Sequence, residues 1–141
     1  MKRKMVCLLF LIMFIFTNTA FATNWVLVLT DDNMQANIYI DADKVFKDVD
    51  TITFWVSFVY EQPLFFKIKK QMWKYVVNTV RPRTFKWLVA YDYDSNGSEL
   101  SCDTKGANYG TSLENSGTDK AATLALKYAK EGKDTGEKPT P

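Results

Sequence analysis

The stretch Thr84–Asp103, read TFKWLVAYDYDSNGSELSCD, decides the expected fold. Its first half alternates large apolar residues with smaller or polar ones, and the large positions are Phe85, Trp87, Val89 and Tyr91. An alternation of period two is typical of a β-strand, so these four side chains are predicted to lie on one face of a sheet. Residues 94–97 (DSNG) predict a tight hairpin turn, because Asn and Gly accept a positive φ. A short return strand follows.

Other parts of the chain show strand patterns as well. Residues 25–29 are a short apolar run and residues 34–40 alternate, which together predict a hairpin. Residues 51–60 alternate most regularly, and Pro63 is expected to end that strand. Residues 64–77 carry both a helical and a strand-like pattern. We prefer a strand from about Gln71 to Asn78, with a bulge or turn near Lys69–Lys70.

One amphipathic helix is expected near the end of the sequence. The helix should run from Asp119 to Glu131 with Thr118 as its N-cap, since apolar residues recur there at helical spacing. Residues 133–141 lack an apolar anchor and are predicted to be disordered. Strands followed by one helix predict an α+β fold, namely a mainly antiparallel sheet of about five to six strands with the C-terminal helix packed on one face. Residues 23–132 would form this single domain.

The first residues have the pattern of a signal peptide. Residues 2–4 are basic, residues 5–16 are apolar, and residues 20–22 (AFA) supply the small residues Ala20 and Ala22 that signal peptidase needs, so cleavage is expected after Ala22. The protein should therefore be exported, to the periplasm, the cell surface or the medium. Removal of residues 1–22 would leave 15 Lys and Arg against 16 Asp and Glu, a net charge of about −1. The charge balance thus gives no argument for nucleic-acid binding.

The cysteine and histidine content limits the possible chemistry. Only Cys102 remains after signal cleavage, so no intramolecular disulfide is expected. A buried structural thiol is the preferred interpretation of Cys102, with an intermolecular disulfide as the alternative. The chain has no histidine, which excludes histidine-based acid/base catalysis and Ser-His or Cys-His nucleophile pairs. No cofactor is predicted.

A basic block lies between Gln62 and Ala90, where the chain has no acidic residue and aromatic residues alternate with the cations. Such a surface fits an anionic partner: a glycosaminoglycan, an anionic lipid or an acidic protein surface. The simpler interpretation, which the pattern favours, places the aromatic residues in the core and the cations on solvated strand faces. If the protein has a cationic contact face, its candidate residues are Lys67, Lys69, Lys70, Lys74, Arg81, Arg83 and Lys86.

The hairpin turn also has the spacing of a calcium loop. Asp92, Asp94, Asn96 and Gly97 occupy the first, third, fifth and sixth places of an EF-hand loop, and Asp103 occupies the twelfth. An EF-hand loop lies between helices and ends on a bidentate Glu, whereas this one lies between expected strands and ends on Asp. A hairpin turn with solvated aspartates is therefore preferred over calcium binding, although both remain open.

Several short elements together resemble a known family: Trp25, Tyr39-Ile40-Asp41, Val45, Trp55, Tyr60 and Tyr93–Gly97. Over roughly Trp25 to Leu100, the chain resembles the surface-adhesin protein E-like domain of bacterial exported proteins. This resemblance implies a small antiparallel sheet with a terminal helix, and adhesion to host cells and matrix proteins. Asn78 stands where the family commonly has Cys, which removes a possible disulfide, and Lys44-Val45 stand where it has Ser-Ile. No binding residue is carried over from the family.

The sequence therefore predicts a non-enzymatic exported binding protein that contacts host or extracellular macromolecules. An anionic glycan or protein surface is the expected partner, and export makes nucleic acid a poor one. The alternative is a periplasmic module that binds a small ligand or inhibits a partner protein, and a ligand-binding module predicts a closed apolar pocket. An enzyme would require a cluster of perturbed carboxylates that no spacing in the sequence indicates. The sequence leaves the oligomeric state open.

Overall fold

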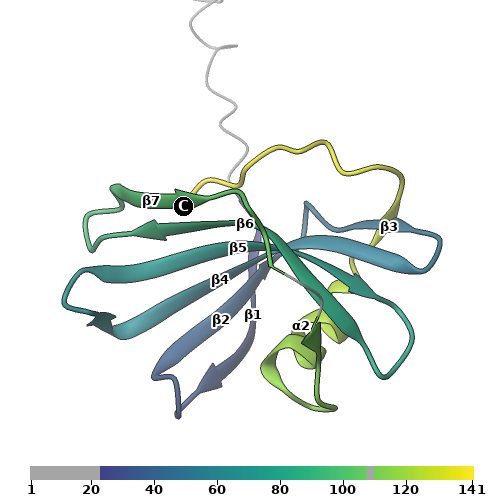
Figure 1. Ribbon diagram of the computed structural model, residues 1–141, viewed down its shortest axis with the longest axis horizontal. Helices are drawn as coiled ribbons and strands as arrows, with labels where there is room; N and C mark the ends of the chain where they lie inside the picture. Colours follow the sequence, from purple (N-terminus) through teal and green to yellow (C-terminus); the bar gives the residue numbers. More distant parts are fainter. Residues whose placement is uncertain (1–22, 108–109) are drawn as a thin grey trace, which may run out of the picture.

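Six strands follow one another across the molecule, each pairing antiparallel with the next, in the order β1-β2-β4-β5-β6-β7 (Figure 1). The computed structural model describes residues 23–107 and 110–141, so the predicted signal peptide lies outside the described residues. The six strands are β1 (Trp25–Asp31), β2 (Ala36–Asp41), β4 (Thr51–Leu64), β5 (Ile68–Asn78), β6 (Thr84–Tyr93) and β7 (Glu99–Asp103). The predicted α+β fold, a mainly antiparallel sheet with one helix, is confirmed.

Three short strands extend this sheet. β3 (Phe46–Asp48) pairs antiparallel with the start of β4, and β9 (Lys130–Glu131) adds to β3 in parallel. β8 (Gly110–Thr111) pairs with the start of β6. The sheet thus has nine strands among the described residues. β8 and β9 flank the helix in the sequence, so both ends of the helical segment are attached to the sheet.

Because of a bulge at Leu88, the large side chains of β6 lie on one face of the sheet before this residue and on the other face after it. Trp87 is opposite Tyr75 and Val89 is opposite Lys74, so Leu88 has no partner residue in β5. An extra residue reverses the alternation of all side chains that follow it. Phe85 and Trp87 consequently pack with the helix-covered core, whereas Val89 and Tyr91 pack on the opposite face. The prediction that these four side chains share one face is therefore wrong.

The helix α2 (Gly117–Ala125) is shorter than predicted and begins earlier. Its N-cap is Ser116 instead of Thr118, and the Ser116 hydroxyl accepts a hydrogen bond from the Asp119 N–H at 3.3 Å. The helix does not continue to Glu131, because the Lys130 N–H donates to the Val45 carbonyl at 3.0 Å and the chain joins β3 as a strand. No described helix has the length and apolarity of a membrane span.

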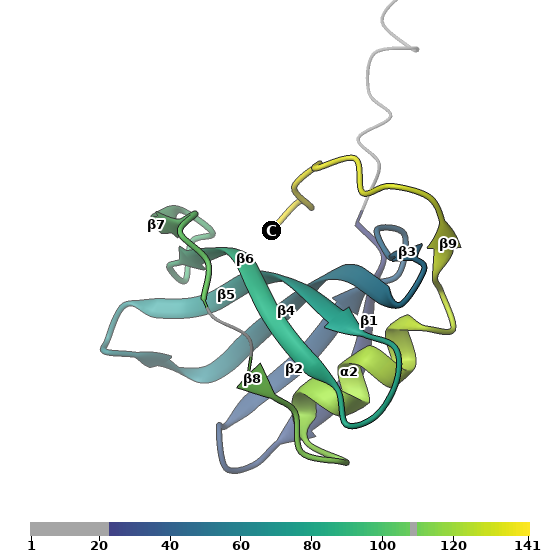
Figure 2. The same cartoon turned by 45° about the vertical axis from the view of Figure 1, so that its right-hand side comes forward.

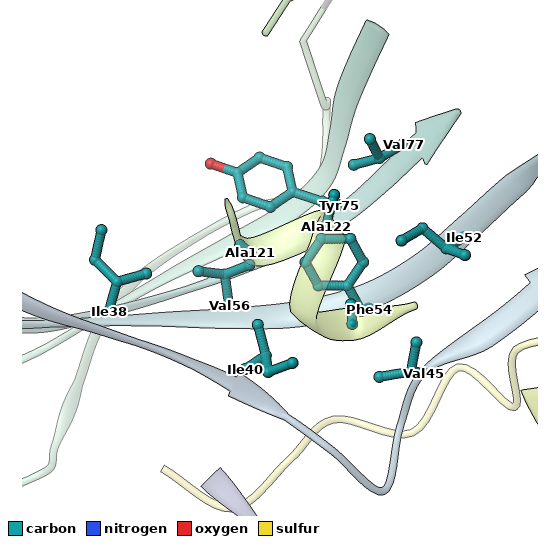
Figure 3. Close-up of a cluster of buried hydrophobic side chains, with 11 residues drawn as sticks. Ile38, Ile40, Val45, Ile52, Phe54, Val56, Tyr75, Val77, Ala121 and Ala122 are labelled. Carbon is teal, nitrogen blue, oxygen red and sulfur yellow. The ribbon is translucent and has the colours of Figure 1, made fainter. Parts of the chain in front are cut away.

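Small residues let α2 lie close to one face of the sheet. Ala121, Ala122 and Ala125 are almost fully buried, and Figure 3 shows Ala121 and Ala122 among side chains from β2, β4 and β5. Alanine adds little bulk between the helix backbone and the sheet, so the larger sheet residues fill the core. The buried sheet and loop residues of this first core are Ile38, Ile40, Val45, Ile52, Phe54, Val56, Tyr75 and Val77.

Residues 64–77, whose sequence carries both a helical and a strand-like pattern, form the end of β4, a turn and most of β5. β4 continues through Pro63 to Leu64, and β5 begins at Ile68, earlier than the expected Gln71. The register shifts between Val59 and Leu64, so Pro63 lies outside the regular pairing and its missing N–H breaks no ladder. The turn therefore forms at residues 65–67, instead of near Lys69–Lys70.

The segment 133–141 contacts the face of the sheet opposite α2, which differs from the predicted disorder. In Figure 2 this segment (yellow) runs from β9 over the end of the sheet and back toward β6. Pro139 is fully buried, and Asp134 and Lys138 form ion pairs with Lys74 and Glu99. Composition alone predicts disorder because the contacts come from residues far away in the sequence.

Candidate functional site

Arg81 and Arg83, two of the candidate cations, bind the N-terminal turn of α2. Arg81 Nη2 donates to Asp119 Oδ2 at 2.7 Å, and Arg83 Nη1 donates to Asp119 Oδ1 at 2.5 Å. Arg83 Nη1 also lies 2.8 Å from the Thr123 hydroxyl. The pKa of Asp119 lies below its ordinary value. Burial acts to raise this pKa, but the hydrogen bonds from Arg81 and the Asn115 N–H, together with the charge of Arg83, have the larger opposite effect. These arginines thus hold the β5–β6 loop against the helix.

Lys70 and Lys74 lie on the face of the sheet opposite α2. Lys74 is only 6% exposed, forms an ion pair with Asp134 and lies over the Trp55 ring at 5.4 Å. Lys70 lies over the Trp25 ring at 5.0 Å, and burial lowers the pKa of Lys70. Both cations therefore take part in internal contacts with aromatic rings.

The remaining three cations are dispersed over β4–β6. Lys67 is exposed at the β4–β5 turn, and Lys69 Nζ donates to the Glu61 carbonyl at 2.8 Å. Lys86 is half-buried in β6, opposite Val76. The structure thus distributes the seven candidates among the β4–β5 hairpin, the sheet face opposite α2 and the N-terminus of α2. It does not bring them together on one cationic face.

The tip of the β4–β5 hairpin exposes two adjacent aromatic rings. Phe65 is 84% exposed and Phe66 is 99% exposed. Both residues have positive φ, 49° and 63°, which is rare for bulky residues. The Lys67 N–H donates to the Leu64 carbonyl at 3.0 Å, so the turn is closed by a hydrogen bond. Sequence reasoning missed this feature because Phe65 also fits the apolar stripe of a helix.

A second, smaller core covers the sheet face opposite α2. Its buried members are Trp55, Met72 and Tyr93, and the half-buried Trp25, Val89 and Tyr91 pack around them. The segment 133–141 lies against this group: Lys138 Nζ is 3.9 Å from the centroid of the Tyr91 ring, and Trp25 Nε1 donates to the Thr140 carbonyl at 3.3 Å. This sheet face thus carries aromatic side chains and the buried Lys74, and the segment 133–141 covers part of it.

The residues with calcium-loop spacing are engaged in turn and strand contacts. Asp94 Oδ1 accepts hydrogen bonds from the N–H groups of Asn96 and Ser98, both at 2.8 Å. Asp92 accepts from the Gln71 amide, and Asp103 from the Lys105 N–H. Among the described residues no group of three or more Asp, Glu, Cys or His side chains is placed to hold a metal ion. The predicted hairpin turn joins β6 and β7, with Gly97 at φ 80°.

Cys102 is exposed on β7, so the prediction of a buried thiol is wrong. β7 is the last strand of the main sheet order, and all five of its residues are exposed. Cys102 is opposite Tyr91 in β6. The thiol is accessible because every residue of this strand is exposed, whereas the prediction of burial rested on the general tendency of free cysteine to be buried.

Two cavities bear on the small-ligand alternative. One of about 140 Å³ lies beneath the N-terminus of α2, between Ile38, Phe58 and Tyr75, and is smaller than the roughly 300 Å³ at which ligand pockets begin. Another, of about 470 Å³, lies between the β2–β3 loop and residues 135–137. Most of the residues around it are polar or charged, and Phe46 is the aromatic residue among them. Neither has the size and apolar lining that the alternative predicts.

Comparisons with family models, with curated proteins and with solved structures found no match to this chain. The resemblance to the surface-adhesin protein E-like domain therefore stays a prediction from the sequence.

Proposed function

We propose that this chain is an exported, non-enzymatic, adhesin-like binding protein that contacts the surface of an extracellular protein through the tip of its β4–β5 hairpin. The observation that carries the proposal is the almost complete exposure of Phe65 and Phe66 at a closed turn. Exposed aromatic residues are characteristic anchors of protein interfaces, because they bury a large apolar area when a partner covers them.

The backbone of the tip supports the same interpretation. A bulky residue with positive φ costs roughly 1–2 kcal/mol, and the rings gain no burial within the chain in return. Strain without local compensation is typical of functional sites. The neighbouring Lys67 adds positive charge next to the rings, which favours an acidic rim around an apolar pocket on the partner.

Binding to immobilised extracellular-matrix proteins and to heparin, measured across a salt series, tests the proposal. The variant F65S/F66S should lose at least about ten-fold in affinity, which corresponds to about 1.4 kcal/mol. The variant K67Q should weaken binding mainly at low salt, because the charge acts at long range.

The matched control is V49S/L113S, which removes two apolar side chains that are 80% and 78% exposed elsewhere on the molecule. This variant should bind as the unaltered chain does. Equal losses in both variants would show a non-specific apolar effect and contradict the proposal. Binding to heparin alone, unchanged by F65S/F66S, would point to a glycan as the partner and also contradict it.

A further inference from the structure

The sheet face opposite α2 is already occupied by a polypeptide segment of defined chemistry. Two residues of this segment contact the face, Asp134 through Lys74 and Lys138 through Tyr91, and Pro139 next to Lys138 is fully buried. The described segment 133–141 contains no helix or strand. It is therefore bound by side chains and isolated backbone groups, as a peptide ligand is, and not by a β-ladder.

Backbone contacts fix the end of the segment. Trp25 Nε1 donates to the Thr140 carbonyl at 3.3 Å, and the Thr140 N–H donates to the Thr23 hydroxyl at 2.8 Å. Lys44 Nζ donates to the Lys138 carbonyl at 3.2 Å and forms an ion pair with Glu137 at 3.4 Å. Such contacts recognise an extended backbone, and a proline between them lowers the entropy lost on binding.

The segment fits this face only partly. Residues 135–137 stand over the cavity of about 470 Å³, which Asp41 also lines. Asp41 is fully buried, yet among the described residues its Oδ2 has no hydrogen-bond partner. An unmatched buried polar atom is costly, so a ligand that supplies a partner for Asp41 Oδ2 gains affinity over the resident segment.

We infer that this face is a peptide-binding surface for an extended, proline-containing segment of another protein, and that residues 134–140 are its intramolecular occupant. The partner segment carries an acidic residue for Lys74 and a cation for the Tyr91 and Tyr93 rings. Aromatic-lined grooves that take preformed proline-rich segments are a common mode of peptide recognition. This surface lies on β1, β4, β5 and β6 and does not depend on the hairpin tip or its function.

A competition experiment with the full chain tests the inference. A fluorescently labelled peptide of residues 133–141 (KDTGEKPTP) is titrated with the unaltered chain and with D134N/K138Q, which loosens the resident segment. Fluorescence anisotropy should show at least about ten-fold tighter binding to D134N/K138Q, because the intramolecular competitor is weakened. Adding K74Q to that variant should remove most of the gain, since Lys74 receives the acidic residue of the peptide.

Matched controls separate recognition from non-specific attraction. E114Q alters an exposed carboxylate near Arg81 and should bind the peptide as the unaltered chain does. A peptide with the same composition in scrambled order should bind at least about ten-fold more weakly. Equal binding of both peptides, or no binding of the ordered peptide to D134N/K138Q at millimolar concentration, would overturn the inference.

The unaltered chain gives a second measurement that requires no substitution. Excess free peptide should displace the resident segment, so the Thr140 N–H of the chain should lose its hydrogen bond to the Thr23 hydroxyl and exchange faster with solvent. If this exchange rate stays unchanged at saturating peptide, the face is a fixed structural contact and the inference is wrong. If D134N/K138Q dimerises and the peptide dissociates the dimer, the surface is supported and its occupant is the segment of a second copy.

Discussion

Arg83 and Asp119 form an almost fully buried ion pair, with Arg83 Nη1 2.5 Å from Asp119 Oδ1. The two residues are 36 positions apart, and their contact joins the β5–β6 loop to the first turn of α2. Arg83 Nη1 also donates to the Asp119 carbonyl at 3.0 Å. One carboxylate therefore organises both the loop and the position of the helix on the sheet.

Replacing Asp119 by Asn should lower the free energy of unfolding by about 3 kcal/mol or more, because removing one partner leaves the buried Arg83 charge uncompensated. Urea denaturation followed by circular dichroism measures the change. Glu114, an exposed partner of Arg81 at 3.3 Å, provides the control: E114Q should change stability by less than about 1 kcal/mol. Equal effects of D119N and E114Q would contradict the structural role of the buried pair.

Acid should remove the contribution of Asp119. The pKa of this carboxyl is lowered in the folded state, so the folded protein binds that proton more weakly than the unfolded chain does. Its stabilisation is present above the unfolded pKa of about 4 and is lost as the pH falls through the lower, folded value. Urea midpoints between pH 7 and pH 2 should thus converge for the unaltered chain and D119N. Parallel curves would show that Asp119 has an ordinary pKa.

The hairpin tip should be more stable without its aromatic side chains. Phe66 has φ 63° and is 99% exposed, so F66G relieves backbone strain without loss of packing. The free energy of unfolding should rise by up to about 1 kcal/mol, the relief being offset in part by the greater freedom of glycine in the unfolded chain. By comparison, F54A in the buried core should lower it by about 3–5 kcal/mol. A clear loss of stability in F66G would show that the ring packs within the chain.

Cys102 should react in the folded protein. Its exposure on β7 predicts that a thiol reagent modifies a chain starting at Thr23 at the same rate with and without denaturant, within a few-fold. Under oxidising conditions the same chain should form a disulfide-linked dimer that C102S cannot form. Modification that requires denaturant would indicate a protected thiol.

The alternation of side chains made much of the fold predictable. In residues 51–60, Ile52, Phe54 and Val56 alternate with residues whose side chains lie on the opposite sheet face. The structure places these three residues in one core, as the geometry of a strand requires. The turn at residues 94–97 was also predictable, because Asn-Gly has a specific backbone preference that does not depend on distant residues.

The candidate site was less predictable, because its contacts join distant residues. Lys74 and Asp134 are far apart in the sequence, and no local pattern indicates that the segment 133–141 meets the sheet. Arg81 and Arg83 resembled a solvent-facing basic pair, whereas Asp119 binds both. A periodic pattern identifies a buried face, but it does not identify the partner that covers it.

Because of the bulge at Leu88, this fold requires a fixed number of residues in β6. Because the bulge turns the residues after it to the other side of the sheet, β6 contributes Trp87 to the layer under α2 and Tyr91 to the layer under residues 133–141. Substitutions of the half-buried Leu88 should be tolerated, but deletion of this residue would exchange the two layers over the rest of the strand. The spacing between Trp87 and Val89 therefore matters more to the architecture than the side chain that lies between them.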